Sequence, residues 1–331
     1  MSDGSKGGTV FASLILVLTT FLGQYSHGQI LELPKLHGPA VNLGGWTDEF
    51  AYQGWRIQRN AVVGHFRLIC PQNKRHAFGS YETCFKEFQE KQRDLHIGPM
   101  PKHVVVMLHG LGATPLVMRG FADYLTVQGG MHVENIGYAS TVENISAFAR
   151  SLDHVIRGFE GVELVDFVAH STGNIVIRRY LGDIERNGIP PPVAFRRMVM
   201  ISPPNHGAEL VDLVSEKSGG IQLIRSVGLA IAGETAIELA PRRGWSELEK
   251  TLVTPPFEFG IIAGGLGNDR GYLNELPGDD DGLLTVETMK LNGATDFVQV
   301  KGIHQLQPAN DKVHAQTLSF LKYGRFGVNT H

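Results

Sequence analysis

The sequence predicts an α/β protein with a mostly parallel central sheet flanked by helices. From residue 103 onward, short apolar runs rich in β-branched residues alternate with amphipathic stretches, which is typical of repeated strand–helix units. The 40 glycines fall mostly at the turns between these runs, as many short strand–helix connections require. A content of 42% hydrophobic and 19% charged residues is that of an ordinary folded protein.

The elements can be placed one by one along the chain. A buried strand is predicted at 103–108, where the β-branched run is continuous, and a helix at 115–128, where a proline occupies the first turn. Ser140 and Glu143 have the spacing of a capping box, which predicts that the next helix begins there. Asn310 is predicted to cap the last helix. The other predicted strands are 133–139, 162–168, 197–202, 257–263 and 297–300, and a further helix is predicted at 173–181.

The N-terminus has the pattern of an export signal. A polar start with Lys6 precedes an apolar run at 10–22, which is short for a membrane span but suits the core of a signal peptide. Ser26 and Gly28 supply small residues for a cleavage site. We therefore expect a signal peptide at 1–28 and an exported protein, secreted or periplasmic. The alternative is an uncleaved segment that tethers the chain to a membrane.

Residues 29–100 do not fit the strand–helix alternation and are predicted to form an N-terminal extension that wraps the core. They contain the only two cysteines, and an even number in an exported protein favours a Cys70–Cys84 disulfide, with two buried free thiols as the alternative. The α/β domain is expected at 101–331. Within it, the helical, glycine-rich stretch 207–250 is expected to be either a cap over the site or a surface insertion.

Ser171 is the candidate nucleophile of the chain. A serine hydroxyl becomes reactive when a base takes its proton, which requires an exposed serine on a fixed turn. Small residues two positions before and after it allow a sharp turn from strand to helix. Ala169 and Gly173 fill those positions in the segment AHSTG. Alanine departs from the G-x-S-x-G pattern at the first position, but it is still small enough for close packing.

A glycine-containing loop upstream supplies candidate oxyanion donors. The segment HGLG, at 109–112, follows the predicted strand that precedes it without a break. Such a loop can aim a backbone N–H at a developing oxyanion, and the residue after the nucleophile supplies the second donor. We assign these donors to the amides of Leu111 and Thr172, and we expect the side chain of His109 to be structural.

The candidate acid and base follow Ser171 in the order serine, acid, histidine. His304 is the candidate base, because it alone among 14 histidines falls between the last predicted strand and the last helix. Asp281 leads as the acid, with Asp280 and Asp279 of the same run as alternatives. The run lacks the spacing of an EF-hand loop, so no metal is predicted, and we expect no cofactor.

The motifs HGLGATP, AHSTG, DDDGLLTVE and GIHQ resemble those of bacterial lipases and esterases of the α/β-hydrolase superfamily, including small secreted lipases with AHSMG elbows. The resemblance covers roughly residues 102–323, with the four motifs in the expected order. It implies an α/β-hydrolase fold, with Ser171 as nucleophile, Asp281 as acid and His304 as base. It also implies that the chain cleaves carboxylic esters, of an ester or lipid-like small molecule, through an acyl-enzyme.

Two other interpretations stay open. The same three residues serve acyl transfer to an alcohol or amide cleavage, because other nucleophiles enter at the acyl-enzyme stage just as water does. A protein of this fold can also act as a binding module without turnover. The net charge of −3 gives no electrostatic reason to expect a nucleic acid as partner.

Overall fold

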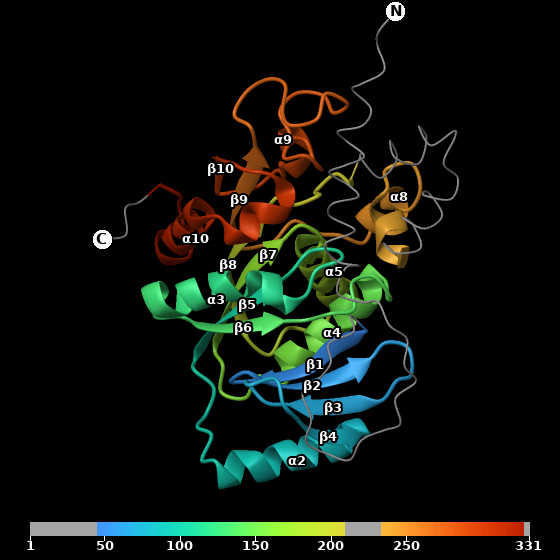
Figure 1. The fold of residues 1–331 in the computed structure, drawn as a ribbon, viewed down its shortest axis with the longest axis vertical. Helices are drawn as coiled ribbons and strands as arrows, with labels where there is room; N and C mark the ends of the chain where they lie inside the picture. The colour runs from blue at the N-terminus through green and yellow to red at the C-terminus, as the bar shows by residue number, and fades with distance from the viewer. Residues whose placement is uncertain (1–44, 209–232, 328–331) are drawn as a thin grey trace, which may run out of the picture. The chain divides into compact units, whose positions relative to one another are not determined.

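The computed structural model describes residues 45–208 and 233–327, with its strands and helices labelled in Figure 1. The predicted signal peptide and membrane tether lie outside the described residues and stay predictions. The same holds for 209–232, the larger part of the predicted cap. Within the two described ranges, none of the helices has both the length and the hydropathy that a membrane crossing requires.

Six parallel strands form the central sheet, in the order β10-β9-β8-β7-β5-β6. This confirms the predicted fold class, because each strand is followed by a helix or a helical turn before the next one begins. The apolar runs of the sequence mark every strand, with boundaries that differ by a few residues. The strands are β5 (His103–Leu108), β6 (His132–Ile136), β7 (Leu164–His170), β8 (Ala194–Ile201), β9 (Glu258–Gly265) and β10 (Asp296–Lys301).

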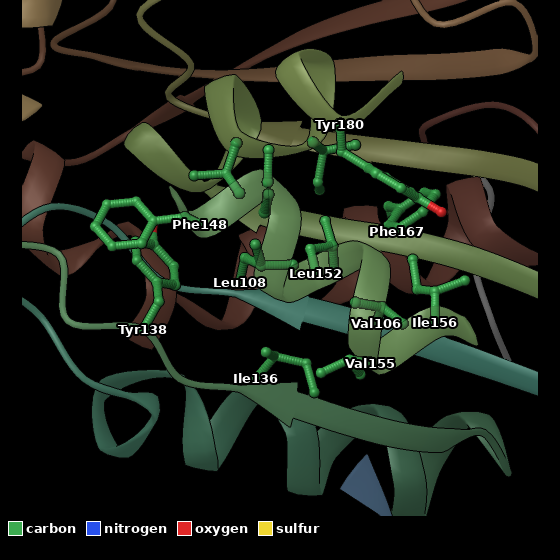
Figure 2. Packing of buried hydrophobic residues seen from close by; sticks show 14 of the residues in the cluster. Val106, Leu108, Ile136, Tyr138, Phe148, Leu152, Val155, Ile156, Phe167 and Tyr180 are labelled. Atoms are coloured by element: carbon green, nitrogen blue, oxygen red, sulfur yellow. The ribbon is translucent and has the colours of Figure 1, made fainter. Parts of the chain in front are cut away.

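Helices cover both faces of this sheet, because successive side chains of each strand point to opposite faces. Val106 and Leu108 of β5 belong to one hydrophobic cluster, whereas Met107 belongs to the other. Figure 2 shows the first cluster, in which Phe148 and Leu152 pack near the β5 side chains. The first face carries α4 (Ile145–Arg157) and α5 (Thr172–Asn187), and the second carries α3 (Pro115–Gly129) and α10 (Asp311–Tyr323). Shorter helical elements are α8 (Trp245–Glu249), α9 (Val286–Met289) and the 3₁₀ helix η1 (His304–Ala309).

The predicted capping box before α4 is wrong. The helix begins at Ile145, and Asn144 is its N-cap, with a side chain that accepts the Ala147 amide at 3.0 Å. Ser140 instead accepts a hydrogen bond from the backbone N–H of Gly112. Asparagine caps a helix as well as serine does. Asn144 directly precedes the first residue of α4 and supplies its cap. The predicted cap of the last helix is confirmed, because Asn310 accepts the amide of Lys312.

The described part of the N-terminal extension is a four-stranded antiparallel sheet followed by one helix. Its strands pair in sequence order, β1-β2-β3-β4. Aromatic residues of this small sheet, among them Phe50 and Trp55, join the cluster that includes Phe148 of α4, so the extension shares a core with the domain. Its elements are β1 (Trp46–Tyr52), β2 (Trp55–Asn60), β3 (Phe66–Ile69), β4 (Arg75–Gly79) and α2 (Tyr81–Asp94).

The predicted Cys70–Cys84 disulfide is absent, and both residues are buried free thiols. Cys70 directly follows β3 and Cys84 lies in α2, and both belong to the hydrophobic cluster, where free cysteine packs as a small apolar residue. Burial raises the pKa of the Cys84 thiol to about 11, which keeps it protonated at neutral pH. The even number of cysteines therefore reflects core packing here rather than a crosslink.

Candidate active site

Ser171 lies on a sharp turn between β7 and α5. Its backbone has φ 53° and ψ −125°, in the positive-φ region that residues other than glycine rarely adopt. The turn is held to the sheet, because the Ser171 N–H donates to the carbonyl of Ile201 at 2.9 Å. Such strain persists only where the surroundings enforce it, and it is often found at functional sites. The turn thus fixes the Ser171 side chain at the carboxyl end of β7.

The small residues on either side of Ser171 have separate packing roles. A Cβ atom on Gly173 would lie 2.8 Å from the carbonyl oxygen of His109 and 3.0 Å from that of Leu108, so only glycine fits there. The start of α5 therefore approaches the end of β5 very closely. Ala169 is fully buried and lies in register between Leu108 and Met200 of the neighbouring strands. Its methyl group fits this site, which explains why the departure from glycine is tolerated.

His304 bridges Ser171 and Asp281. Its Nε2 lies 2.8 Å from the Ser171 Oγ, and its Nδ1 lies 2.7 Å from an Asp281 carboxylate oxygen. An ionised carboxylate only accepts hydrogen bonds, so Nδ1 is assigned the proton and Nε2 accepts from the serine hydroxyl. All three side chains are buried, with Ser171 the most exposed at 7%. The structure thus brings the three predicted residues into one hydrogen-bonded row.

Asp281 is fixed both by its own loop and by His304. One carboxylate oxygen accepts the backbone amides of Leu283 and Leu284 at 3.1 and 2.9 Å. The His304 amide also donates to the Asp281 carbonyl, at 2.8 Å. Burial by itself would raise the pKa of Asp281, but the charge and hydrogen bond of His304 and the Leu284 amide hold it below its ordinary value. The carboxylate is therefore ionised where His304 needs a negative partner.

The two alternative acids bind backbone amides instead of a histidine. Asp279 accepts the amides of Leu266 and Gly267, each at 2.8 Å. Asp280 accepts the Gly282 amide at 2.7 Å. Both carboxylates shape the loops around the site, whereas Asp281 alone of the three contacts His304. In the part of the chain that the structure describes, no group of three or more His, Cys, Asp or Glu residues is arranged to hold a metal ion.

The loop 109–112 lies directly against the nucleophile. A Cβ atom on Gly110 would be 3.0 Å from the Ser171 Cβ, so glycine allows the loop its close approach. The N–H of Leu111 finds no acceptor among the described residues. The N–H of Thr172 is in the first turn of α5, where a helix offers no internal acceptor. The assignment of these two amides as oxyanion donors stays a prediction.

His109 is held by contacts with its neighbours in the core. Its ring is fully buried, its Nδ1 donates to the Gly110 carbonyl at 2.8 Å, and it stacks on Tyr138 with ring centroids 4.3 Å apart. Burial lowers the pKa of His109 to about 4, so the ring is neutral near pH 7. These contacts agree with the structural role expected from the sequence.

Solved structures with similar backbones identify the fold. The mature form of the lipase BlEst2 from Bacillus licheniformis is similar with a TM-score of 0.52 and 20% identity, over 70% of this chain and 95% of that one. Its propeptide form gives a TM-score of 0.50 and 18% identity, over 71% and 53%. The chain has the α/β-hydrolase fold. No family model and no curated protein matches the sequence.

In this α/β-hydrolase sheet the candidate site lies where the strand order reverses. From β5 the chain moves outward to β6 and then returns to place β7 on the other side of β5. Ligands of open α/β sheets bind outside the carboxyl ends of the strands at such a switch point. The loop 109–112 leaves β5 there, and Ser171 follows β7. His304 and Asp281 reach the same place from the turns beyond β10 and β9.

The sequence interpretation missed one residue at this site, His170. Its Nε2 donates to the backbone carbonyl of His304 at 3.0 Å, and the two rings lie 4.9 Å apart. Burial, followed by the nearby His304, lowers the pKa of His170 to about 3, so the ring is a neutral donor. Nothing in the sequence indicates a contact between residues 134 positions apart.

Proposed function

We propose that this chain hydrolyses carboxylic esters through an acyl-enzyme at Ser171. The observation that carries the proposal is the unbroken row of hydrogen bonds from the Ser171 hydroxyl through His304 to Asp281. A serine hydroxyl is a weak nucleophile, and a neutral imidazole at hydrogen-bond distance is the base that activates it. Proteins of one fold can have unrelated functions, so the proposal rests on these three side chains and not on the fold.

In the acylation step, the Ser171 Oγ attacks the ester carbonyl carbon while its proton passes to the His304 Nε2. The carbonyl oxygen becomes an oxyanion, for which the amides of Leu111 and Thr172 are the proposed donors. The ionised Asp281 stabilises the imidazolium that forms. When the intermediate collapses, the bond to the alcohol oxygen breaks, and His304 gives its proton to the departing alcohol.

Deacylation repeats these steps with water. A water molecule donates a proton to the His304 Nε2 and attacks the acyl carbon, and the same two amides receive the oxyanion. The bond between the acyl carbon and the Ser171 Oγ then breaks, and the proton returns from His304 to the serine. The products are a carboxylic acid and an alcohol, with the site restored.

Apolar side chains beside the base support a substrate with an apolar part. Ile303 and Leu306 flank His304 in sequence and are 37% and 58% exposed. Exposed aliphatic groups next to a reacting centre favour contact with acyl or alcohol chains over contact with a charged substrate. The similar BlEst2 structures carry the name lipase, which agrees with an ester or lipid-like substrate.

Turnover of a series of p-nitrophenyl esters by wild type and Ser171→Ala tests the proposal. We expect Ser171→Ala to lower kcat by about 10⁴-fold or more while the protein stays folded. Ser146→Ala, in α4, is the control for a serine substitution elsewhere and should retain wild-type turnover. Full turnover by Ser171→Ala would refute the proposal, and the preferred chain length in the wild type would define the acyl group.

A further inference from the structure

A short segment after β6, residues 137–140, holds the first end of the loop 109–112. Tyr138 stacks on His109 with the two ring planes within 6° of each other, and its hydroxyl donates to the His109 carbonyl. The Tyr138 amide also faces the His109 Nε2, at 3.4 Å. Since all of these groups are buried, water does not compete for the contacts.

The same segment holds the second end of the loop through Ser140. The Gly112 N–H donates to the Ser140 Oγ at 3.0 Å, and Ser140 is only 3% exposed. Gly112 has a positive φ of 69°, so the chain turns sharply at the residue that this bond fixes. Leu111, the proposed oxyanion donor, lies directly before it. The direction of the Leu111 amide therefore depends on an anchor one residue away.

Strand β1 of the N-terminal extension in turn holds residues 137–140. Asp48 bonds to both sides of Gly137: its amide donates to the Gly137 carbonyl at 2.8 Å, and its carboxylate accepts the Gly137 amide at 2.6 Å. The Ala139 amide donates to the Thr47 hydroxyl at 3.1 Å. Thr47 and Asp48 are both fully buried. Hydrogen bonds therefore run from the extension through residues 137–140 to the loop 109–112.

We propose that Ser140 is a positioning residue that sets the Leu111 amide through Gly112, and that β1 keeps Ser140 in place. This inference rests on the proposed function, since it assumes that Leu111 binds an oxyanion. The oxyanion exists only after the nucleophile has attacked, so a misdirected amide weakens the transition state more than the bound ester. Loss of the Ser140 contact should therefore lower kcat and leave KM nearly unchanged.

The test compares Ser140→Ala with Ser140→Thr and Val142→Ala in the full chain. Ser140→Ala removes the acceptor and Ser140→Thr keeps a hydroxyl. Val142→Ala is the control, because it changes an exposed side chain two residues after Ser140. Because complete loss of one oxyanion donor lowers kcat by about 10²–10³-fold, we expect a smaller loss of about tenfold in Ser140→Ala. Inhibition by a trifluoromethyl ketone, which forms a tetrahedral adduct with a serine, should weaken by a similar factor. Ser140→Thr should recover most of both losses.

Wild-type kcat in Ser140→Ala, or a rise in KM at constant kcat, would overturn the inference. Failure of the proposed function looks different, because then the wild type itself would show no turnover or Ser171→Ala would retain it. If Ser140→Ala does not fold, Thr47→Val decides instead, with Thr47→Ser as its control. Thr47→Val removes the acceptor of Ala139 and should lower kcat at constant KM. Wild-type kcat in that variant would overturn the role of β1.

Discussion

The ring of His170, next to the candidate nucleophile, donates a hydrogen bond to the backbone carbonyl of His304, the candidate base. The contact joins the turn after β7 to the turn after β10, across the intervening strands β8 and β9. The distance between Ser171 and His304 is thus fixed by a second link besides their own hydrogen bond. A base held to within a fraction of an ångström is what proton transfer from a serine requires.

Replacing His170 should therefore slow turnover without a change at the reacting groups themselves. In His170→Ala the His304 carbonyl loses its donor and the ring leaves a cavity, so we expect kcat to fall by about tenfold or more. His170→Gln, whose amide can reach the same carbonyl, should keep more activity than His170→Ala. Steady-state kinetics on a short-chain ester measures kcat of both variants. A wild-type kcat in both His170→Ala and His170→Gln would contradict the role of His170 in positioning His304.

The same ring predicts a pH dependence of stability. Its folded pKa of about 3 is below the ordinary 6.5, so below pH 6.5 the unfolded chain binds a proton that the native chain does not. The contribution of the neutral His170 ring to the free energy of unfolding is therefore fully present above pH 6.5, and it is lost progressively as the pH falls below 6.5. Relative to His170→Gln, the free energy of unfolding of the wild type should drop by about 1.4 kcal/mol per pH unit in this range.

Urea unfolding at a series of pH values measures this difference. A difference between wild type and His170→Gln that stays constant with pH would show that the His170 ring is protonated in the folded protein.

Gly173→Ala tests the close approach of α5 to β5. The new methyl group would meet two backbone carbonyl oxygens, which cannot move without shifting a strand end, so we expect a loss of about 2–4 kcal/mol in the free energy of unfolding. Gly120→Ala is the matched control, because its Cβ would meet nothing within 4 Å in an exposed part of α3. That change should stabilise the protein by up to about 1 kcal/mol. Similar effects at both sites would contradict the packing argument.

Asp281→Asn and Asp279→Asn separate the acid from its neighbours. Asparagine at 281 loses the charge that stabilises the His304 imidazolium and can favour the wrong tautomer, so kcat should fall by about 10³–10⁴-fold. Asp279→Asn changes a carboxylate that binds the amides of Leu266 and Gly267 and the side chain of Gln299, so kcat should stay near that of the wild type. A larger kinetic loss in Asp279→Asn than in Asp281→Asn would reverse the assignment.

The fold and the members of the candidate site could be predicted because each leaves a local pattern. Continuous apolar runs such as His103–Leu108 mark buried parallel strands, and loops that follow such strands gather at one edge of the sheet. Ser171 and His304 each follow such a strand, so the order of elements along the chain is enough to predict that they lie at the same edge of the sheet. The pattern says nothing of hydrogen bonds, which is why the roles of His170 and Ser140 could not be predicted.

Where several equivalent side chains compete, the sequence leaves the choice open. Asp279, Asp280 and Asp281 are chemically identical neighbours, and the loop backbone decides which of them turns toward His304. The capping box predicted a helix start at Ser140, whereas the structure uses the Asn144 side chain as the cap of α4. Cys70 and Cys84 followed packing rather than the pairing that their number indicated.

Labelling with a fluorophosphonate tests the central claim most directly, because the reagent reacts with a serine only when a neighbouring base activates it. Mass spectrometry of the digested, labelled protein should place one adduct on the peptide that contains Ser171. His304→Ala, which removes the base, should abolish the labelling, and Val142→Ala should retain it. An unlabelled Ser171 in folded wild-type protein, or an adduct on another serine, would contradict the account.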